Sequence, residues 1–412
     1  MVQQWSKPIC PRRSVEPSLI VKRPEGVPEY DLLLLDVKTR SLRPLSPRFS
    51  AQVGFFNAVW SRDGRRVAFL SIDRSALVRA WVWTVGTAAA SLVPNVDPRV
   101  GSGGDQGAGR PLTSFFKIWE ANGWLQGVKL GRAESFTYKT NDGSSQIAWL
   151  LLPPDHVRGT RVPVVTVVYP GNVYRSTEPG AFSPYDPNFE HPQLFAALGY
   201  AVLLPSMPAP KEEADSHALT PLPNGVIPAI DAAIANGHAD PDRIAVLGQS
   251  SGGFAVLGLI TQTNRFRSAI ASAGFSNFQS LYGTFYGQFR YGDAGHPEAA
   301  QVLRMLQLEK GAMSLGGPPW KEADRYREHS AIHLAHKVET PLLLIHGELD
   351  FIPIQQSEEF FTALFRQDKR VRFLRYTGEG HTINARANVL HMWQQLEQWL
   401  KETMLPRSGP NR

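Results

Sequence analysis

A serine flanked by two glycines is the strongest chemical signal in the sequence. Residues 248–252 have the sequence Gly-Gln-Ser-Ser-Gly, so Ser250 has one glycine two positions before it and another two positions after it. The apolar run 243–247 predicts a strand before this turn, and the apolar run 253–262 predicts a helix after it. A strand, a tight Gly-x-Ser-x-Gly turn and a helix are typical of a nucleophile elbow. We therefore predict that Ser250 is a nucleophile. Ser251 is the alternative, but only the first serine has both glycines.

Two residues later in the chain could complete a catalytic triad with Ser250. An acyl-transfer serine needs a base that accepts its proton and an acid that orients the base. The strand predicted at 341–345 is followed by Asp350, and the strand predicted at 371–376 is followed by His381. The order serine, acid, histidine is that of α/β-hydrolases. Because the carboxyl ends of parallel strands meet at one edge of a sheet, we expect the three side chains to converge.

Several neighbouring residues are weaker candidates for chemistry. Glu348 is an alternative orienting acid, although a solvated loop carboxylate would look the same. We interpret His346 as a structural or supporting residue. His329, His333 and His336 have helical spacing in a polar stretch, without a carboxylate or cysteine partner at a fixed spacing. This pattern indicates a surface helix rather than a metal site, and we predict no metal and no cofactor.

The reaction also needs two hydrogen-bond donors for the negative oxygen of its intermediate. The backbone N–H of Ser251 is expected to supply one of them, because this residue follows the nucleophile. The second donor is expected from the loop that follows the first long strand of the catalytic region, at residues 169–172.

The catalytic residues lie in a region, 131–405, where predicted strands and helices alternate. The expected strands are 134–140, 146–152, 162–169, 201–204, 243–247, 269–272, 341–345 and 371–376, and the expected helices are 192–198, 226–235, 253–262, 357–365 and 388–404. Alternation of this kind predicts an α/β fold, with a mostly parallel sheet covered by helices on both faces. Residues 406–412 are expected to form a tail.

Residues 28–95 have a different, all-β character. Asp63-Gly64 lies between two β-rich runs and predicts a tight hairpin. This hairpin and the two β-rich runs after it resemble one blade of a β-propeller, with an unrelated β-meander as the alternative. A closed propeller has about four to eight blades, so the predicted region is incomplete. Residues 1–27 are expected to be an irregular lead-in, and residues 96–130 a linker.

Composition limits the class of protein. The 412 residues are 42% hydrophobic and 19% charged, enough for a buried core and for more than one domain. The net charge is +6, but the basic residues are scattered, which argues against a nucleic-acid partner. Cys10 is the single cysteine, which excludes an intramolecular disulfide. Since the N-terminus lacks a secretory signal and no apolar run approaches the roughly 20 residues of a membrane span, we expect a cytoplasmic protein without membrane contact.

Residues 130–405 resemble the catalytic domain of the prolyl oligopeptidase family of serine peptidases. The resemblance rests on the elbow with its second glycine at 248–253, the His-Gly-Glu-Leu-Asp stretch at 346–350, the Gly-Glu-Gly-His turn at 378–381, and Tyr169. It implies an α/β-hydrolase fold preceded by a β-propeller, which agrees with the blade-like region near the N-terminus.

The resemblance also implies roles for further residues. Tyr169 is expected to donate its hydroxyl to the oxyanion, beside the N–H of Ser251. Short peptides are the expected substrates. Phe278, Tyr282 and Phe285 lie in an aromatic segment that could wall the substrate pocket, although ordinary core packing explains them equally well.

The predicted function is the hydrolysis of short peptides by a peptidase of the prolyl oligopeptidase or acylaminoacyl-peptidase type. Dipeptidyl peptidases of the family hold the substrate's amino terminus with paired glutamates in the propeller, and residues 28–95 contain no such pair. The alternatives are a carboxylesterase-like serine hydrolase, and an inactive truncated homologue with a binding role. Assembly into a homo-oligomer is left open.

Overall fold

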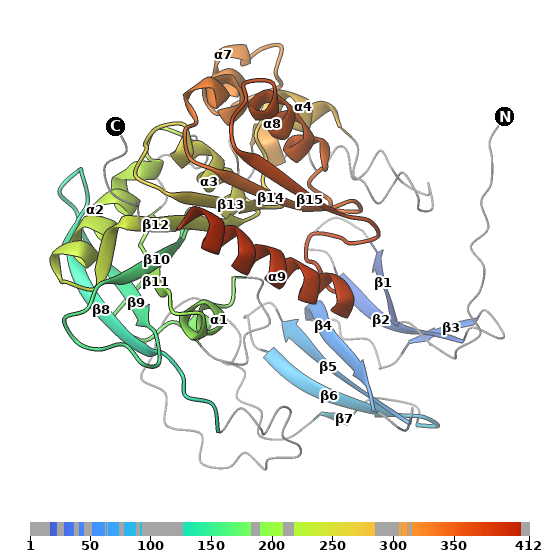
Figure 1. Ribbon diagram of the computed structural model, residues 1–412. Coiled ribbons are helices and arrows are strands. Elements are labelled where there is room, and N and C mark those ends of the chain that lie inside the picture. Colours follow the sequence, from blue (N-terminus) through green and yellow to red (C-terminus); the bar gives the residue numbers. More distant parts are fainter. Residues whose placement is uncertain are drawn as a thin grey trace, which may run out of the picture. The chain divides into compact units, whose positions relative to one another are not determined.

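A mostly parallel, eight-stranded sheet organises the C-terminal part of the chain in this computed structural model (Figure 1). Its order is β15-β14-β13-β12-β10-β11-β9-β8. The strands are β8 (Arg132–Lys139), β9 (Ser145–Leu152), β10 (Val162–Val167), β11 (Ala201–Leu204), β12 (Ala239–Gln249), β13 (Ser268–Ser272), β14 (Leu342–Gly347) and β15 (Val371–Tyr376). Antiparallel pairing is confined to one edge, where β9 pairs with both β8 and β11. The predicted α/β fold is confirmed.

Helices cover both faces of this sheet, as its strands require. β13 is buried at every position, and β10 is buried from Val164 to Val167. Such uniformly buried strands need apolar cover on both sides. The helices are α1 (Pro192–Ala197), α2 (Leu222–Ala235), α3 (Ser251–Ile260), α4 (Phe278–Gly283), α7 (Ala323–Glu328), α8 (Gln355–Phe365) and α9 (Arg386–Thr403). Among the described residues of this unit, Gly180–Phe182 and Ala331–Lys337 form short 3-10 helices.

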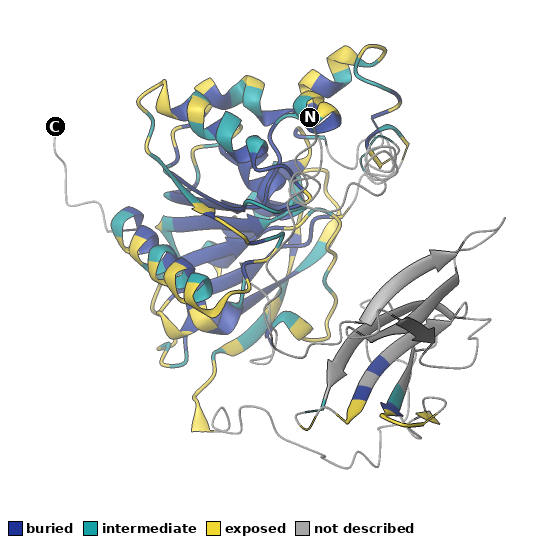
Figure 2. Ribbon diagram, turned by 90° about the vertical axis from the view of Figure 1, so that its right-hand side faces the viewer, coloured by how far each residue is buried: buried dark blue, intermediate teal, exposed yellow. Residues whose placement is uncertain are grey.

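The hydrophobic core consists of two layers, one on each face of the sheet. One layer contains buried side chains of α2, α3, α4, α7 and α8. The other contains side chains of α1 and α9, among them Phe195, Leu396 and Trp399. Figure 2 shows the buried strands between helices whose outer faces are exposed. This two-sided cover holds the carboxyl ends of the strands in fixed positions.

The structure describes two compact units, Met1–Gly123 and Trp124–Arg412. In the second unit it describes residues 127–404, apart from 183–189, 209–217, 285–304, 306, 311–312 and 314. In the first unit it describes 17–22, 29–36, 41–44, 52–61, 63, 65–73, 78–87 and 91–92. The tail predicted at 406–412 lies outside these residues, and so does most of the linker predicted at 96–130.

Unit Met1–Gly123 contains two antiparallel sheets. One has three strands, β1 (Pro17–Lys22), β2 (Glu29–Asp36) and β3 (Ser41–Pro44). The other has four, β4 (Gln52–Trp60), β5 (Arg66–Asp73), β6 (Val78–Thr84) and β7 (Ser91–Leu92). The second sheet has the strand number of a propeller blade, but a closed propeller is not shown, because the described strands form only these two sheets.

Local contacts explain two features of this unit. In the turn between β4 and β5, Ser61 Oγ donates to Asp63 Oδ1 at 2.6 Å, and the backbone N–H of Arg65 donates to the same oxygen at 3.0 Å. The hairpin predicted there is therefore present. Strand β1, in contrast, lies inside the lead-in that was expected to be irregular. Its apolar residues at 19–21 pair with β2, a non-local partner that a short run without periodicity does not reveal.

No helix in the described part of the chain is long and apolar enough to cross a bilayer.

Candidate active site

The nucleophile elbow is formed by the end of β12, Ser250 and the start of α3. Ser250 has φ 59° and ψ −120°, a backbone conformation that non-glycine residues rarely adopt. The two flanking glycines make the turn possible. A Cβ at Gly248 would lie 2.5 Å from the backbone of Gly252, and a Cβ at Gly252 would lie 2.4 Å from the carbonyl oxygen of Val168. The glycine spacing is therefore a steric requirement of this turn.

A third glycine brings the elbow against the neighbouring strand. A Cβ at Gly253 would lie 2.7 Å from the carbonyl oxygen of Ser272 and 2.8 Å from the Cα of Gly274. The Ser250 N–H donates to the Ser272 carbonyl at 2.9 Å, and the Phe254 N–H donates to the Ser250 carbonyl at 3.0 Å. These contacts fix the serine at the first turn of α3, where the positive end of the helix dipole favours negative charge.

Asp350 and His381 are hydrogen-bonded to each other. His381 Nδ1 lies 2.8 Å from Asp350 Oδ1 and 3.0 Å from Oδ2. Asp350 is 1% exposed, and its Oδ1 also accepts from the Ile352 N–H at 2.8 Å. With Nδ1 donating to the carboxylate, Nε2 of His381 is the ring nitrogen left to exchange protons with a reactant.

His346 supports the same carboxylate from the other side. Its Nε2 lies 2.9 Å from the Ile352 carbonyl and 3.3 Å from Asp350 Oδ2, and its Nδ1 lies 2.7 Å from Ser357 Oγ. Nε2 can donate to the Ile352 carbonyl and to Asp350, and Nδ1 can pair with the Ser357 hydroxyl, so both ring nitrogens have partners. Burial acts to raise the pKa of Asp350, but hydrogen bonds and charge from His346 and His381 outweigh it and hold the pKa below its usual value. The carboxyl group is therefore ionised at neutral pH.

The loops that carry Asp350 and His381 touch each other directly. A Cβ at Gly347 would lie 2.1 Å from the Gly380 carbonyl oxygen, so a side chain there would separate the loops. The Leu349 N–H donates to the Glu379 carbonyl at 2.8 Å, which ties the loops by a backbone hydrogen bond. The contact between acid and histidine thus depends on the absence of a side chain at position 347.

Glu379 anchors the histidine loop to the start of α9. It is 5% exposed and accepts from the N–H groups of Asn384 at 2.8 Å and Ala385 at 3.0 Å, and from Asn388 Nδ2 at 2.6 Å. Burial acts to raise the pKa of Glu379, but these three hydrogen bonds lower it below its usual value. The sequence prediction gave Glu379 no role, because its partners lie five to nine residues further on and form no recognisable motif.

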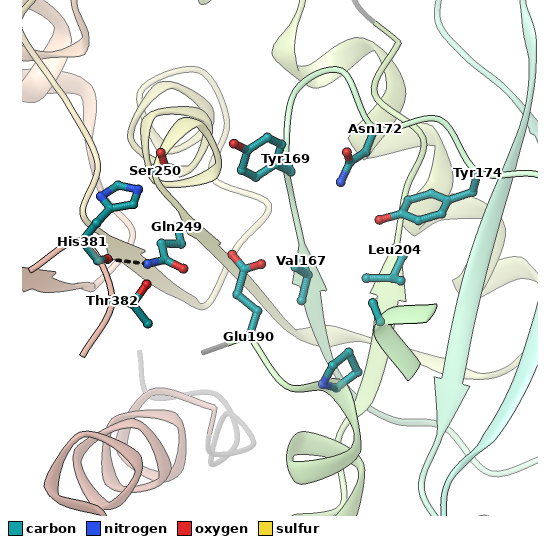
Figure 3. A pocket seen from close by; sticks show the side chains of 12 residues that line it. Val167, Tyr169, Asn172, Tyr174, Glu190, Leu204, Gln249, Ser250, His381 and Thr382 are labelled. Carbon is teal, nitrogen blue, oxygen red and sulfur yellow. Dashed lines mark hydrogen bonds between the residues drawn. The ribbon is translucent and has the colours of Figure 1, made fainter. Parts of the chain in front are cut away.

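Ser250, His381 and Tyr169 line one cavity of about 360 Å³. Figure 3 shows the Tyr169 hydroxyl turned toward Ser250, with His381 on the other side of the serine. Gln249 fixes the backbone here, because its Nε2 donates to the His381 carbonyl at 2.6 Å. The remaining lining residues are Val167, Asn172, Tyr174, Ala181, Glu190, Pro192, Leu204 and Thr382.

The weaker candidates lie elsewhere. Glu348 pairs with Arg375 at 2.8 Å, whereas the carboxylate that contacts His381 belongs to Asp350.

His329 is buried after α7, and His333 and His336 belong to the 3-10 helix that follows. The prediction that these histidines lie on a surface helix is therefore wrong for His329. The spacing of the three histidines in the sequence does not reveal that His329, at the end of α7, is buried. In the part of the chain that the structure describes, no three metal-binding side chains cluster.

Phe278 and Tyr282, the described residues of the aromatic segment predicted for the substrate pocket, are not among the residues that line this cavity. Phe278 is fully buried and packs against Phe254 and Phe275 at centroid distances of 5.7 and 5.4 Å, as the core alternative expects. Tyr282 is 7% exposed, and its hydroxyl lies 2.8 Å from Glu309 Oε1. Phe285 lies outside the described residues.

Comparison with known proteins assigns the α/β unit to a family. Residues 223–310 and 303–406 match the sequence model of the prolyl oligopeptidase family, Peptidase_S9. The α/β unit belongs to the prolyl oligopeptidase family. This confirms the resemblance inferred from the elbow, the acid stretch and the histidine turn.

Relatives with curated descriptions are longer than this chain. An uncharacterized peptidase of Bacillus subtilis, YuxL, is 29% identical over 262 residues, which is 61% of this chain and 36% of the relative. A probable chloroplastic glutamyl endopeptidase of Oryza sativa is 27% identical over 292 residues, 67% of this chain and 28% of the relative. An acylamino-acid-releasing enzyme of Arabidopsis thaliana is 30% identical over 165 residues, 38% of this chain and 19% of the relative. The chain therefore spans well under half the length of these relatives.

Solved structures of similar fold include two peptidases. The acylaminoacyl peptidase of Pyrococcus horikoshii matches with a TM-score of 0.54 at 18% identity, covering 96% of this chain and 57% of that one. A puromycin-hydrolyzing peptidase of Mycobacterium tuberculosis matches with a TM-score of 0.53 at 20% identity, covering 92% and 52%. At these identities the likeness concerns the fold.

Proposed function

We propose that this protein is a serine peptidase that hydrolyses short peptides through an acyl-enzyme intermediate. The observation that carries the proposal is the Asp350–His381 hydrogen bond at 2.8 Å, in a cavity that His381 shares with the strained Ser250. The family of the α/β unit supports a peptidase rather than another hydrolase.

In the first half-reaction, Ser250 Oγ attacks the scissile carbonyl carbon while His381 Nε2 takes the hydroxyl proton. Asp350 stabilises the imidazolium and keeps Nδ1 protonated. His381 then gives the proton to the leaving amine, and the C–N bond breaks to leave an ester on Ser250. In the second half-reaction, His381 activates water, which attacks the ester and releases the acid.

The negative oxygen of each tetrahedral intermediate needs two donors. In the proposed mechanism these are the backbone N–H of Ser251 and the hydroxyl of Tyr169. Ser251 is the first residue of α3 and directly follows Ser250, the position whose N–H serves the oxyanion hole in this type of elbow. Tyr169 is 38% exposed on the cavity wall, and a phenol hydroxyl can donate in its neutral form. Removal of one such donor typically costs about a hundredfold to a thousandfold in rate.

The subtype proposed is the oligopeptidase or acylaminoacyl-peptidase type. An acylamino-acid-releasing enzyme is among the relatives in sequence, and an acylaminoacyl peptidase is among the structures of similar fold. Oligomeric state and cellular location stay predictions from the sequence.

The first test is covalent labelling with a fluorophosphonate probe, which reacts with activated serines. We expect the wild-type protein to be labelled and Ser250→Ala to be unlabelled, because the alanine has no oxygen to phosphonylate. The matched control is Ser251→Ala, which keeps the backbone N–H and should still be labelled. Labelling that survives in Ser250→Ala would show that the nucleophile is another residue.

A second measurement separates a peptidase from an esterase. Amide and ester substrates with the same acyl group are compared, and a digest of a peptide library is analysed by mass spectrometry. We expect cleavage of amide bonds in short peptides. Turnover of the esters alone would replace the proposal with the carboxylesterase alternative.

A further inference from the structure

The residues that carry the Tyr169 hydroxyl form a tight turn. After β10 the chain has the sequence Tyr169-Pro170-Gly171-Asn172, and the Asn172 N–H donates to the Tyr169 carbonyl at 3.2 Å. A proline at the second position and a glycine with φ 92° at the third position are typical of a type II turn. The sequence therefore explains the shape of the turn, but the closing hydrogen bond does not fix its place in the protein.

The chain that follows β11 holds this turn in place. The Gly171 N–H donates to the Met207 carbonyl at 2.7 Å, and the Met207 N–H donates to the Asn172 carbonyl at 2.6 Å. Two residues after the turn, on the same wall of the cavity (Figure 3), the Tyr174 N–H donates to Ser206 Oγ at 2.9 Å. Of these three hydrogen bonds, only the last uses a side chain, so the residue type matters at position 206.

Ser206 connects the turn to the sheet. It is fully buried, and its Oγ donates to the Ile147 carbonyl of β9 at 2.6 Å while it accepts from Tyr174. The carbonyl of Ser206 accepts from the Tyr138 hydroxyl of β8 at 3.0 Å. A hydroxyl can donate one hydrogen bond and accept others at the same time, which a methyl group cannot do. The Ser206 hydroxyl therefore fixes the segment of Tyr174 against a strand of the sheet.

On its other side, the turn touches the nucleophile elbow. A Cβ at Gly252 would lie 2.4 Å from the Val168 carbonyl oxygen and 3.4 Å from the Tyr169 ring. Tyr169 thus lies between the elbow and the residues that Ser206 holds. A small shift of the turn changes the direction of the Tyr169 hydroxyl relative to Ser250. Because hydrogen bonds weaken steeply with distance and angle, such a shift would weaken a bond to an oxyanion.

We propose that Ser206 is a positioning residue that holds the Tyr169 hydroxyl in place for the oxyanion, through its hydrogen bond to the Tyr174 N–H. It touches no substrate, since it is fully buried and is not among the residues that line the cavity of Ser250. The inference rests on the proposed function, in which Tyr169 is one of two donors. Loss of the Ser206 hydroxyl should therefore lower the rate only while the Tyr169 hydroxyl is present.

The test is a double-mutant cycle of Ser206→Ala and Tyr169→Phe, with kcat and KM measured for p-nitrophenyl acetate. This ester requires no knowledge of the natural peptide, and its hydrolysis passes through the same kind of oxyanion. We expect kcat to fall about 100- to 1000-fold in Tyr169→Phe. In Ser206→Ala it should fall about tenfold, with little change in KM. Added to Tyr169→Phe, Ser206→Ala should lower kcat by no more than about twofold, because no donor is left to position.

The matched control is Ser330→Ala. Ser330 is also buried, and its Oγ accepts from the Phe278 N–H of α4 and donates to the Tyr326 carbonyl of α7. We expect this variant to lose as much Tm as Ser206→Ala and to keep the wild-type kcat. A second variant, Ser206→Cys, has a similar volume but a weakly hydrogen-bonding thiol, so it should show the same coupling to Tyr169→Phe if Ser206→Ala does not fold.

The outcomes separate this inference from the proposed function. If Ser206→Ala lowers kcat equally with and without the Tyr169 hydroxyl, or if Ser330→Ala lowers it as much, the positioning role is overturned and the peptidase function stands. If neither Ser206 variant folds, the residue serves the fold and the role is overturned as well. If Tyr169→Phe keeps full activity, the Tyr169 donor and this inference are both wrong, while labelling of Ser250 still tests the nucleophile. Hydrolysis of the ester without any cleavage of peptides would overturn the peptidase function alone.

Discussion

At the scale of single residues, the site depends on a buried carboxylate held between two histidines. Asp350 contacts His381 on one side and His346 on the other, and both contacts favour its ionised form. Only one of these histidines borders the cavity. We infer that His346 is a positioning residue, which acts on the reaction through Asp350 without touching a substrate.

Substitution of His346 should lower kcat more than it changes KM. His346→Leu removes the donor that faces Asp350 and leaves Ser357 Oγ and the Ile352 carbonyl without their partner. We expect kcat to fall about 10- to 100-fold, the range for a lost hydrogen bond to a charged group. His346→Gln can place an amide N–H near the position of Nε2 and should retain more activity. Steady-state kinetics of both variants test this, and equal losses in the two would contradict a positioning role.

The sequence alone did not predict every residue that lines the cavity. The convergence of Ser250, Asp350 and His381 could be predicted because each follows a strand and their chain order is fixed in the fold. Glu190 could not, because it lies in a loop whose course over the cavity depends on tertiary contacts. Phe278 is the reverse case, a residue predicted for the pocket that lies in the core. An aromatic residue in an apolar run fits a pocket wall and a core equally well, so the sequence does not distinguish the two.

At the scale of elements, the site lies where loops after β12, β14 and β15 meet. The two later loops are in backbone contact through Gly347 and Gly380, and Glu379 ties the second of them to α9. Glu379 therefore stabilises the loop of His381 and the first turn of the longest helix together. Its carboxylate should contribute to the stability of the whole unit.

The contribution of Glu379 should depend on pH in a defined direction. Its pKa in the folded protein is lowered below the usual 4.5, so the unfolded chain binds its proton more readily. The stabilisation is then fully present above pH 4.5 and is lost as the pH falls through the lowered folded value. Glu379→Gln should accordingly have a lower Tm than the wild type at pH 7, with a difference that shrinks below pH 4.5.

Thermal unfolding between pH 3 and pH 7 measures this difference. A suitable control is Glu328→Gln, which removes an exposed carboxylate at the end of α7 and should follow the wild-type curve. A Glu379→Gln deficit that stays constant across the whole range would show that packing, not ionisation, is the cause.

The strand pattern of the α/β unit was largely predictable, and the reason is visible in its burial. Strands β10 and β13 are short, apolar and buried on both faces, a combination typical of parallel sheets. Strand β1 was not predicted because it forms by pairing with β2, and its own short sequence carries no strand pattern. The number of propeller blades could not be predicted from the strands either, since one hairpin signal specifies a sheet and not a ring.

At the scale of the molecule, the α/β unit contains everything that the proposed mechanism requires. All eight strands of its sheet, both core layers and the cavity come from residues 124–412. In the part of unit Met1–Gly123 that the structure describes, no strand joins this sheet. The two units should therefore be separable.

We expect residues 124–412, produced alone, to fold and to react with a fluorophosphonate probe at Ser250. Circular dichroism and a cooperative thermal transition test the fold, and labelling tests the site. The full-length chain and its Ser250→Ala variant serve as the positive and negative references. A shortened chain that is helical but unlabelled would show that the first unit is needed to complete the site.

The order in which the strands are synthesised also determines when the proposed activity can arise. β10 and β12 pair directly although a long stretch of chain separates them, and β14 and β15 are the last strands made. The proposed nucleophile, Ser250, is synthesised well before Asp350, and His381 comes after the final strand of the sheet. In a growing chain, Ser250 therefore has neither Asp350 nor His381 beside it until the last strand is in place. In the proposed mechanism, the activity can therefore arise only after the last strand of the sheet and the loop of His381 are in place.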